Sequence, residues 1–224
     1  MATDNNTLEA KNGDSCHSCK NRRTILSLMA SGLTCIVSSY AFGSSLLTPS
    51  QMLGPFYPEK IPLEHDNDLT TVSGNYGISA GEISHLIGQV LTPNGSPVIG
   101  AKIEIWQCDA FGQYKHPGGG GGQDPNFQGY GRTRSGVDGQ YRFKTIKPVT
   151  YPGRTPHIHM RIVSKNANLT TQLYVKGERL NDRDFILNAI RNTRARSSLI
   201  IPFVHEPGFP PDELVARFDP VVAG

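Results

Sequence analysis

Short strand-like runs separated by turn signals recur after residue 85, and they constrain the fold more than any other feature. The runs lie at residues 86–91, 102–107, 141–145, 157–163, 171–175 and 198–204. Asn94-Gly95 and Asp138-Gly139 are dipeptides typical of tight hairpins. Only residues 182–192 space their apolar side chains as a helix does. Strands of this number and spacing predict an all-β protein, an antiparallel β-sandwich with long irregular loops and an extended N-terminal arm.

The chain divides into three zones by composition. Residues 1–43 read as a leader with a signal peptide, residues 44–84 as an extended arm rich in turn formers, and residues 85–224 as the sandwich domain. A chain of 224 residues is long enough to bury one sizeable core. The net charge of +3 is too small to indicate nucleic acid or an anionic membrane surface as a partner.

The leader has the pattern of a secretory signal. Basic residues precede an apolar run at residues 25–42, which ends in small side chains, so export to the periplasm or the exterior is expected. Arg22-Arg23 resembles the twin-arginine type. Two alternatives remain. The first is an uncleaved membrane anchor, because the run of about 18 residues is near the lower limit for spanning a bilayer; the second is lipid attachment at Cys35.

His157 and His159 lie two apart in a predicted strand, so both project from one face, while Ile158 between them projects from the other. Two imidazoles on one face can chelate a metal ion, although a hydrogen-bonded or surface pair is also consistent with this spacing. Tyr114 and Tyr151 are further candidate ligands if they converge on the histidines in space, which spacing alone does not show.

Three separated stretches resemble the intradiol ring-cleavage dioxygenases, with the closest likeness to the protocatechuate 3,4-dioxygenase branch. They read TPSQMLGPFYP at residues 48–58, IWQCDAFGQY at residues 105–114 and YPGRTPHIH at residues 151–159. The likeness extends from about Thr48 to Phe218. It implies a β-sandwich enzyme that uses non-haem ferric iron and O2 to cleave a catechol-type, protocatechuate-like aromatic diol between its two hydroxyls. The product would be a cis,cis-muconate-type diacid.

The resemblance also implies four protein ligands for Fe(III), namely Tyr114, Tyr151, His157 and His159. Phenolate oxygen suits a hard cation, and a strong cation is needed to ionise phenols whose ordinary pKa is about 10. Zinc is the main competitor, since two histidines are common in its sites. Tyr151 lies on a loop between prolines rather than in a strand, so it is the ligand expected to leave when substrate binds.

Four further residues match positions near the family's active site. Arg154 resembles an arginine that steadies the reacting ring, with a plain salt bridge as the alternative. Gln172 resembles a glutamine near the iron, or makes a buried hydrogen bond. Tyr57 is expected to approach the substrate or to pack the arm down, and Arg132 to meet an acidic substrate or to be solvated. Gly153 replaces an aromatic residue of the protocatechuate enzymes, so catechol, hydroxyquinol or another diol also remains open.

Between Tyr114 and Tyr141 the chain is expected to leave the sheets, with a flexible glycine run at residues 118–122. All four candidate ligands lie on one chain, so we expect a homo-oligomer, with a small aromatic diol and O2 as its other partners. Membrane contact would come only through an uncleaved leader. Two other classes compete with the enzyme: an exported metal-binding β-sandwich module without turnover, and a structural or adhesion domain.

Overall fold

The computed structural model describes residues 45–115 and 123–224; the predicted leader and the glycine run at 118–122 lie outside these ranges. The described strands are β1 (Ile83–Gln89), β2 (Lys102–Trp106), β3 (Tyr130–Arg134), β4 (Gln140–Ile146), β5 (His157–Val163), β6 (Asn168–Val175), β7 (Ile200–Ile201) and β8 (Leu214–Arg217). A 3-10 helix, η1 (Arg179–Arg183), and two short helices, α1 (Phe185–Asn188) and α2 (Thr193–Ser198), follow β6. Within the two described ranges, no helix is long and apolar enough to cross a membrane.

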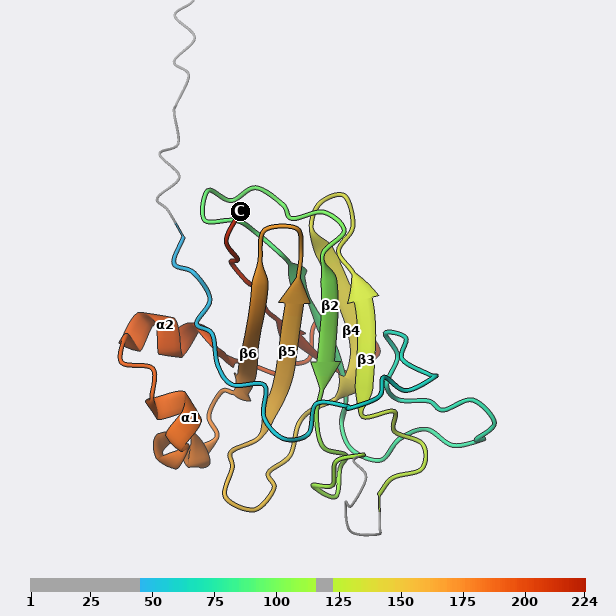
Figure 1. Ribbon diagram of the computed structural model, residues 1–224. Coiled ribbons are helices and arrows are strands. Elements are labelled where there is room, and N and C mark those ends of the chain that lie inside the picture. Colours follow the sequence, from blue (N-terminus) through green and yellow to red (C-terminus); the bar gives the residue numbers. More distant parts are fainter. Residues whose placement is uncertain (1–44, 116–122) are drawn as a thin grey trace, which may run out of the picture. The chain divides into compact units, whose positions relative to one another are not determined.

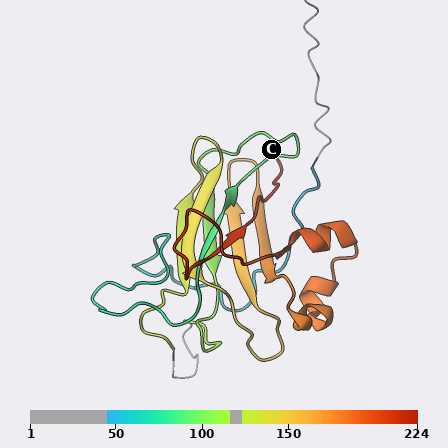
Figure 2. The same cartoon turned by 180° about the vertical axis from the view of Figure 1, so that it is seen from behind.

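The strands form two sheets that lie one behind the other, as Figures 1 and 2 show from opposite sides. The larger sheet has the order β3-β2-β5-β6-β7 and the smaller one the order β4-β1-β8. Alternate side chains from both sheets fill the core between them, including Ile105, Ile158 and Met160 from the larger sheet and Leu86 and Phe143 from the smaller. The predicted all-β sandwich is confirmed, with two parallel pairs, β1–β8 and β6–β7, among the antiparallel ones.

The two predicted hairpin turns are present, and the first closes a short local hairpin, in which Leu91 bridges Pro97 in antiparallel and the Val98 amide donates to the Val90 carbonyl at 2.8 Å. Gly95 and Gly139 have φ of +82° and +74°, as such turns require. However, the first turn lies between β1 and β2, and the second between β3 and β4, which belong to different sheets. The hairpin prediction is therefore confirmed at Asn94-Gly95 as a local hairpin, whereas β3 and β4, on either side of Asp138-Gly139, do not pair with each other. Each turn carries the chain across the sandwich, so that successive strands cover opposite sides of one core.

Other segment predictions are also corrected. The segment expected to leave the sheets contains β3, whose glycine and arginines conceal its alternating pattern, and β8 was not predicted at all. The helix predicted at residues 182–192 is broken because the Asp184 backbone is extended and its side chain caps α1. The strand predicted at 198–204 shrinks to β7, since α2 continues to Ser198.

The arm crosses the outer face of the larger sheet, in front of β6, β5, β2 and β3 in Figure 1. The Gln51 amide donates to the Thr170 carbonyl at 2.7 Å, and the Gln51 side chain accepts from the Gln172 amide at 2.8 Å. Gly54 then passes so close to His159 that an added Cβ would lie 3.2 Å from the ring, and its φ is +78°. The arm thus covers the face of the sheet on which both histidines lie.

Candidate metal centre

Strand β5 presents His157 and His159 on the outer face of the larger sheet, beneath the arm. Both side chains are buried, with 1% and 2% of their surface exposed. The strand register sets His159 between Trp106 of β2 and Gln172 of β6. The Trp106 ring stacks on the His159 imidazole, with centroids 4.8 Å apart and planes 9° apart.

The two imidazoles turn the same nitrogen towards each other. The Nδ1 of His157 lies 2.7 Å from the Thr155 carbonyl, so it carries the proton and leaves Nε2 with a lone pair. That Nε2 lies 3.2 Å from Nε2 of His159. Burial lowers the pKa of His157 to about 4, and the Arg154 charge adds to the shift; burial also holds the pKa of His159 well below its usual range. Both rings are therefore neutral at pH 7, the form that binds metals.

Tyr114 and Tyr151 reach the histidines from two loops. The Tyr114 hydroxyl lies 3.5 Å from Nε2 of His157, and the Tyr151 ring is centred 5.5 Å from both the Tyr114 and His157 rings. Gly112 permits this approach, because its φ is +74° and an added Cβ would lie 3.0 Å from the carbonyl oxygen of Thr150. The structure thus brings all four predicted ligand residues together.

The phenols are not ionised by the protein alone. Burial raises the pKa of Tyr114 well above its usual range. Burial also raises the pKa of Tyr151, although the nearby Arg154 guanidinium opposes that rise. The buried phenol of Tyr114 and the half-buried phenol of Tyr151 therefore need an added cation before they become phenolates.

The donor set fits a hard metal ion. Two atoms that both bind one ion at about 2.1 Å lie at most about 4.2 Å apart, and His157 Nε2 meets this limit with both His159 Nε2 and the Tyr114 hydroxyl. Nδ1 of His159 and Nε2 of Gln172 are buried without a hydrogen-bond partner among the described residues. Across the described residues, no three or more His, Cys, Asp or Glu side chains are grouped so that they could hold a metal ion. A common zinc site uses these residue types, so the two tyrosine oxygens distinguish this site from it.

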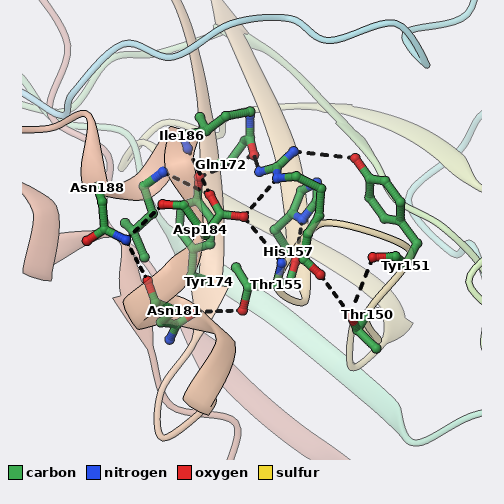
Figure 3. A network of polar contacts seen from close by, with 12 residues as sticks. Thr150, Tyr151, Thr155, His157, Gln172, Tyr174, Asn181, Asp184, Ile186 and Asn188 are labelled. Atoms are coloured by element: carbon green, nitrogen blue, oxygen red, sulfur yellow. Dashed lines mark hydrogen bonds and ion pairs between the residues drawn. The ribbon is translucent and has the colours of Figure 1, made fainter.

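Arg154 joins Tyr151, Gln172 and Asp184 in a polar network, and Figure 3 labels these three partners. Nη1 of Arg154 donates to the Tyr151 hydroxyl at 3.4 Å, its Nη2 to Gln172 Oε1 at 2.6 Å, and its Nε to Asp184 Oδ2 at 2.8 Å. Sequence reasoning found Arg154 and Gln172 but missed Asp184. The available signal was an aspartate directly before an apolar run, which is typical of a helix N-cap.

Burial raises the pKa of the Asp184 carboxyl, but hydrogen bonds from Arg154 and from backbone amides more than offset this and hold its pKa below the usual range. The carboxylate is therefore ionised at neutral pH and forms an ion pair with Arg154.

A cavity of about 290 Å³ opens beside Tyr114 and Trp106. Aromatic and proline side chains form much of its wall, namely Phe56, Pro58, Pro62, Trp106, Tyr114 and Tyr130. Phe56 stacks on Tyr114 with centroids 4.3 Å apart. Glu64 and Lys115 are the charged residues among those that line it. Trp106 is thus shared by the metal-ligand group and the cavity, a role that sequence reasoning did not assign to it.

Tyr57 and Arg132 are not among the residues that line the cavity. The Tyr57 hydroxyl donates to buried Glu104 at 3.2 Å, and its ring meets the edge of Trp106, which fits the arm-packing alternative. Arg132 contacts His65 of the arm at 2.8 Å. The substrate roles predicted for these two residues stay predictions.

Comparisons with known proteins agree on one family. The family model described as Dioxygenase matches residues 52–224. The protocatechuate 3,4-dioxygenase beta chain of Burkholderia cepacia is 36% identical over 73% of this chain and 73% of its own. The hydroxyquinol 1,2-dioxygenase of Nocardioides simplex is 29% identical over 82% of this chain, but only 64% of its own length is matched.

A solved structure shares the fold over a similar range. It is the dioxygenase domain of a dioxygenase carbohydrate-binding protein fusion from Streptomyces sp. SirexAA-E, with a TM-score of 0.59 and 30% identity. The alignment covers 79% of this chain and 98% of that domain.

Proposed function

The chain belongs to the intradiol ring-cleavage dioxygenases, and on that premise we propose that it cleaves a catechol-type, protocatechuate-like substrate between its two hydroxyl-bearing carbons. The carbon–carbon bond breaks, and both atoms of O2 enter the product, a cis,cis-muconate-type diacid. Fe(III) would be held by Tyr114, Tyr151, His157 and His159.

One observation supports this proposal above all others. Two neutral imidazole nitrogens face each other at 3.2 Å beneath two phenols in a buried site. When bound there, ferric iron supplies the charge that ionises both phenols and activates the diol towards O2. The alternative, an exported metal-binding module without turnover, needs the same ligands but has no use for Arg154 beside them.

The protein's own groups have separate tasks in this proposal. Once ionised, the Tyr151 oxygen would receive one hydroxyl proton of the diol, and Arg154 Nη1, 3.4 Å from this oxygen, would hold it in place. The guanidinium then favours negative charge on the reacting oxygens. Phe56 stacks on Tyr114, and Trp106 stacks on His159. Both side chains exclude water from the space next to the substrate ring.

The protocatechuate-like preference draws support from Lys115, a cation in the wall of the adjoining cavity that suits a ring carboxylate. Gly153 offers no side chain for this purpose. The substrate assignment is tested by comparing kcat/KM for protocatechuate, catechol and hydroxyquinol in the wild type and in Lys115→Met. Lys115 is exposed, so we expect Lys115→Met to lower kcat/KM for protocatechuate about three- to fivefold and to leave catechol within twofold.

Equal losses for the two substrates would contradict a carboxylate-binding role for Lys115. Absence of ring cleavage with every diol, in protein that retains iron, would contradict the enzyme itself and favour the binding module.

We also propose export to the periplasm or exterior, on the sequence pattern of residues 1–43, with residues 44–84 as the arm and 85–224 as the catalytic domain. A homo-oligomer is proposed because all four candidate ligands lie on one chain. Sedimentation and N-terminal sequencing of the secreted protein test these points; a protein retained in the cytoplasm, or a monomer, would contradict the corresponding proposal.

A further inference from the structure

Asp184 makes more contacts at the site than a helix cap needs. Its side chain is fully buried. Oδ1 accepts from the amides of Ile186 at 3.1 Å and Leu187 at 2.9 Å, which caps α1. Oδ2 faces the opposite way and accepts from Arg154 Nε at 2.8 Å and from the Thr155 amide at 3.2 Å. One carboxylate thus joins a short helix to the loop that precedes the ligand strand (Figure 3).

These contacts fix the orientation of the Arg154 guanidinium. The group is planar, and its N–H donors point in set directions. Asp184 holds Nε, and Gln172 Oε1 holds Nη2 at 2.6 Å. Two fixed edges leave the third, Nη1, directed at the Tyr151 hydroxyl. The Phe185 ring, next to Asp184, lies 5.6 Å from the guanidinium carbon and covers its face.

The same carboxylate also acts on the ligand strand. It binds the amide of Thr155, whose carbonyl accepts from Nδ1 of His157 and so sets the tautomer of that ring. Thr155 is held a second time where its hydroxyl donates to Asn181 at 2.8 Å. Asp184 therefore has a direct path to Arg154 and a second, supported path to His157.

We propose that Asp184 is a positioning residue, which orients Arg154 so that its Nη1 donates to Tyr151 and to the reacting oxygens of the substrate. Its catalytic consequence rests on the proposed ring-cleaving function, whereas its geometric content does not. The competing explanation is that Asp184 only caps α1. Asn192 provides the comparison, because it caps α2 by accepting from the Ala195 amide, and in the described part of the chain no hydrogen bond or ion pair joins it to Arg154.

Exchange of the arginine Nε–H with solvent tests the geometry in the metal-free protein. We expect 15N NMR to show the Arg154 Nε–H exchanging at least about tenfold more slowly than those of exposed Arg191 and Arg194, since a buried ion pair protects it. Asp184→Ser keeps a good N-cap residue and is expected to remove this protection, whereas Asn192→Ala is expected to preserve it. Wild-type exchange as fast as that of the exposed arginines would overturn the proposal, as would protection that survives Asp184→Ser.

A double-mutant cycle on the iron-loaded enzyme tests the consequence. We expect Asp184→Ser to lower kcat about 10- to 100-fold, as loss of a partner that orients an active-site group does. In an Arg154→Gln background the same change is expected to alter kcat by no more than about twofold, because the group it orients is gone. Multiplicative losses would show that Asp184 acts independently of Arg154, through folding or through Thr155 and His157, and would overturn the proposal. A wild type that cleaves no diol would defeat the proposed function, and the exchange result would still decide the positioning role.

Discussion

Each of the two sheets has buried histidine on its outer face, but the hydrogen-bond partners of these histidines differ. On the smaller sheet, Nε2 of His85 donates to Glu213, and Nδ1 accepts from Arg142 at 3.0 Å, so both nitrogens are used within the protein. On the larger sheet, His157 and His159 turn their Nε2 atoms towards each other, and within residues 45–115 and 123–224 no carboxylate is hydrogen-bonded to either ring. A histidine whose nitrogens are all engaged is structural, whereas converging nitrogens indicate a metal site.

Replacing one histidine on each face is expected to give the largest difference in iron content and activity. His157→Gln removes a metal donor, so we expect iron content to fall to near zero and kcat/KM to drop more than about 100-fold, beyond the loss of a supporting partner. His85→Gln is expected to keep iron and activity but to reduce the free energy of unfolding by about 1–3 kcal/mol, since Glu213 and Arg142 lose a buried partner. Metal analysis and urea unfolding check both. Loss of iron from His85→Gln would remove the distinction between the faces.

Replacing two glycines of the arm is expected to give an effect of intermediate size on iron affinity. Gly54 and Gly74 have similar φ, +78° and +85°, but only at Gly54 would a Cβ crowd His159. Gly74→Ala is expected to cost about 1 kcal/mol of stability through its backbone alone. Gly54→Ala should cost a similar amount and also lower iron affinity about tenfold, because the arm can no longer close over His159. Equal iron affinity in the two variants would show that the arm does not shape the site.

The smallest expected effect is the acid response of the smaller sheet. Burial raises the pKa of Glu213, but hydrogen bonds from Lys144 and His85 outweigh it and leave the pKa below the usual range. Its stabilising contribution is therefore complete above the unfolded pKa, near 4.3, and is lost as pH falls through the lower folded value. Glu213→Gln should lower the free energy of unfolding by no more than about 1 kcal/mol at pH 6. It should also reduce the further fall in that free energy below pH 4.

Urea unfolding at pH 6 and pH 3.5 measures this response, with iron content as the second readout. Iron binding by Glu213→Gln is expected to match that of the wild type at pH 6. A fall in iron content at that pH would contradict the separation of the two faces.

The sequence predicts those parts of this molecule that depend on local period. The two-residue spacing of His157 and His159 on a strand, with Ile158 in the core, follows directly from the alternation of side chains. Which sheet each strand joins does not follow, because Asn94-Gly95 specifies a tight turn with local pairing but not that β2 then joins the sheet opposite β1.

Within the candidate site, the residue types were predictable but their partners were not. Arg154 was found because its stretch, residues 151–159, resembles the family's motif, whereas Asp184 lies 30 residues farther along and reaches it only through tertiary packing. Trp106 could have been suspected as a tryptophan at the end of a strand whose alternate residues are buried. The convergence of Tyr114 with Tyr151 depends on two loops meeting at Gly112, which no local pattern encodes.

The most direct test of the metal centre is the visible absorption spectrum of the iron-loaded protein, recorded without oxygen before and after addition of catechol. Tyrosinate bound to Fe(III) predicts a broad visible band that shifts to longer wavelength when catechol is added, and that is absent from His157→Gln but retained by His85→Gln. A protein that stays colourless after reconstitution with iron would contradict the assignment of Tyr114, Tyr151, His157 and His159 as its ligands.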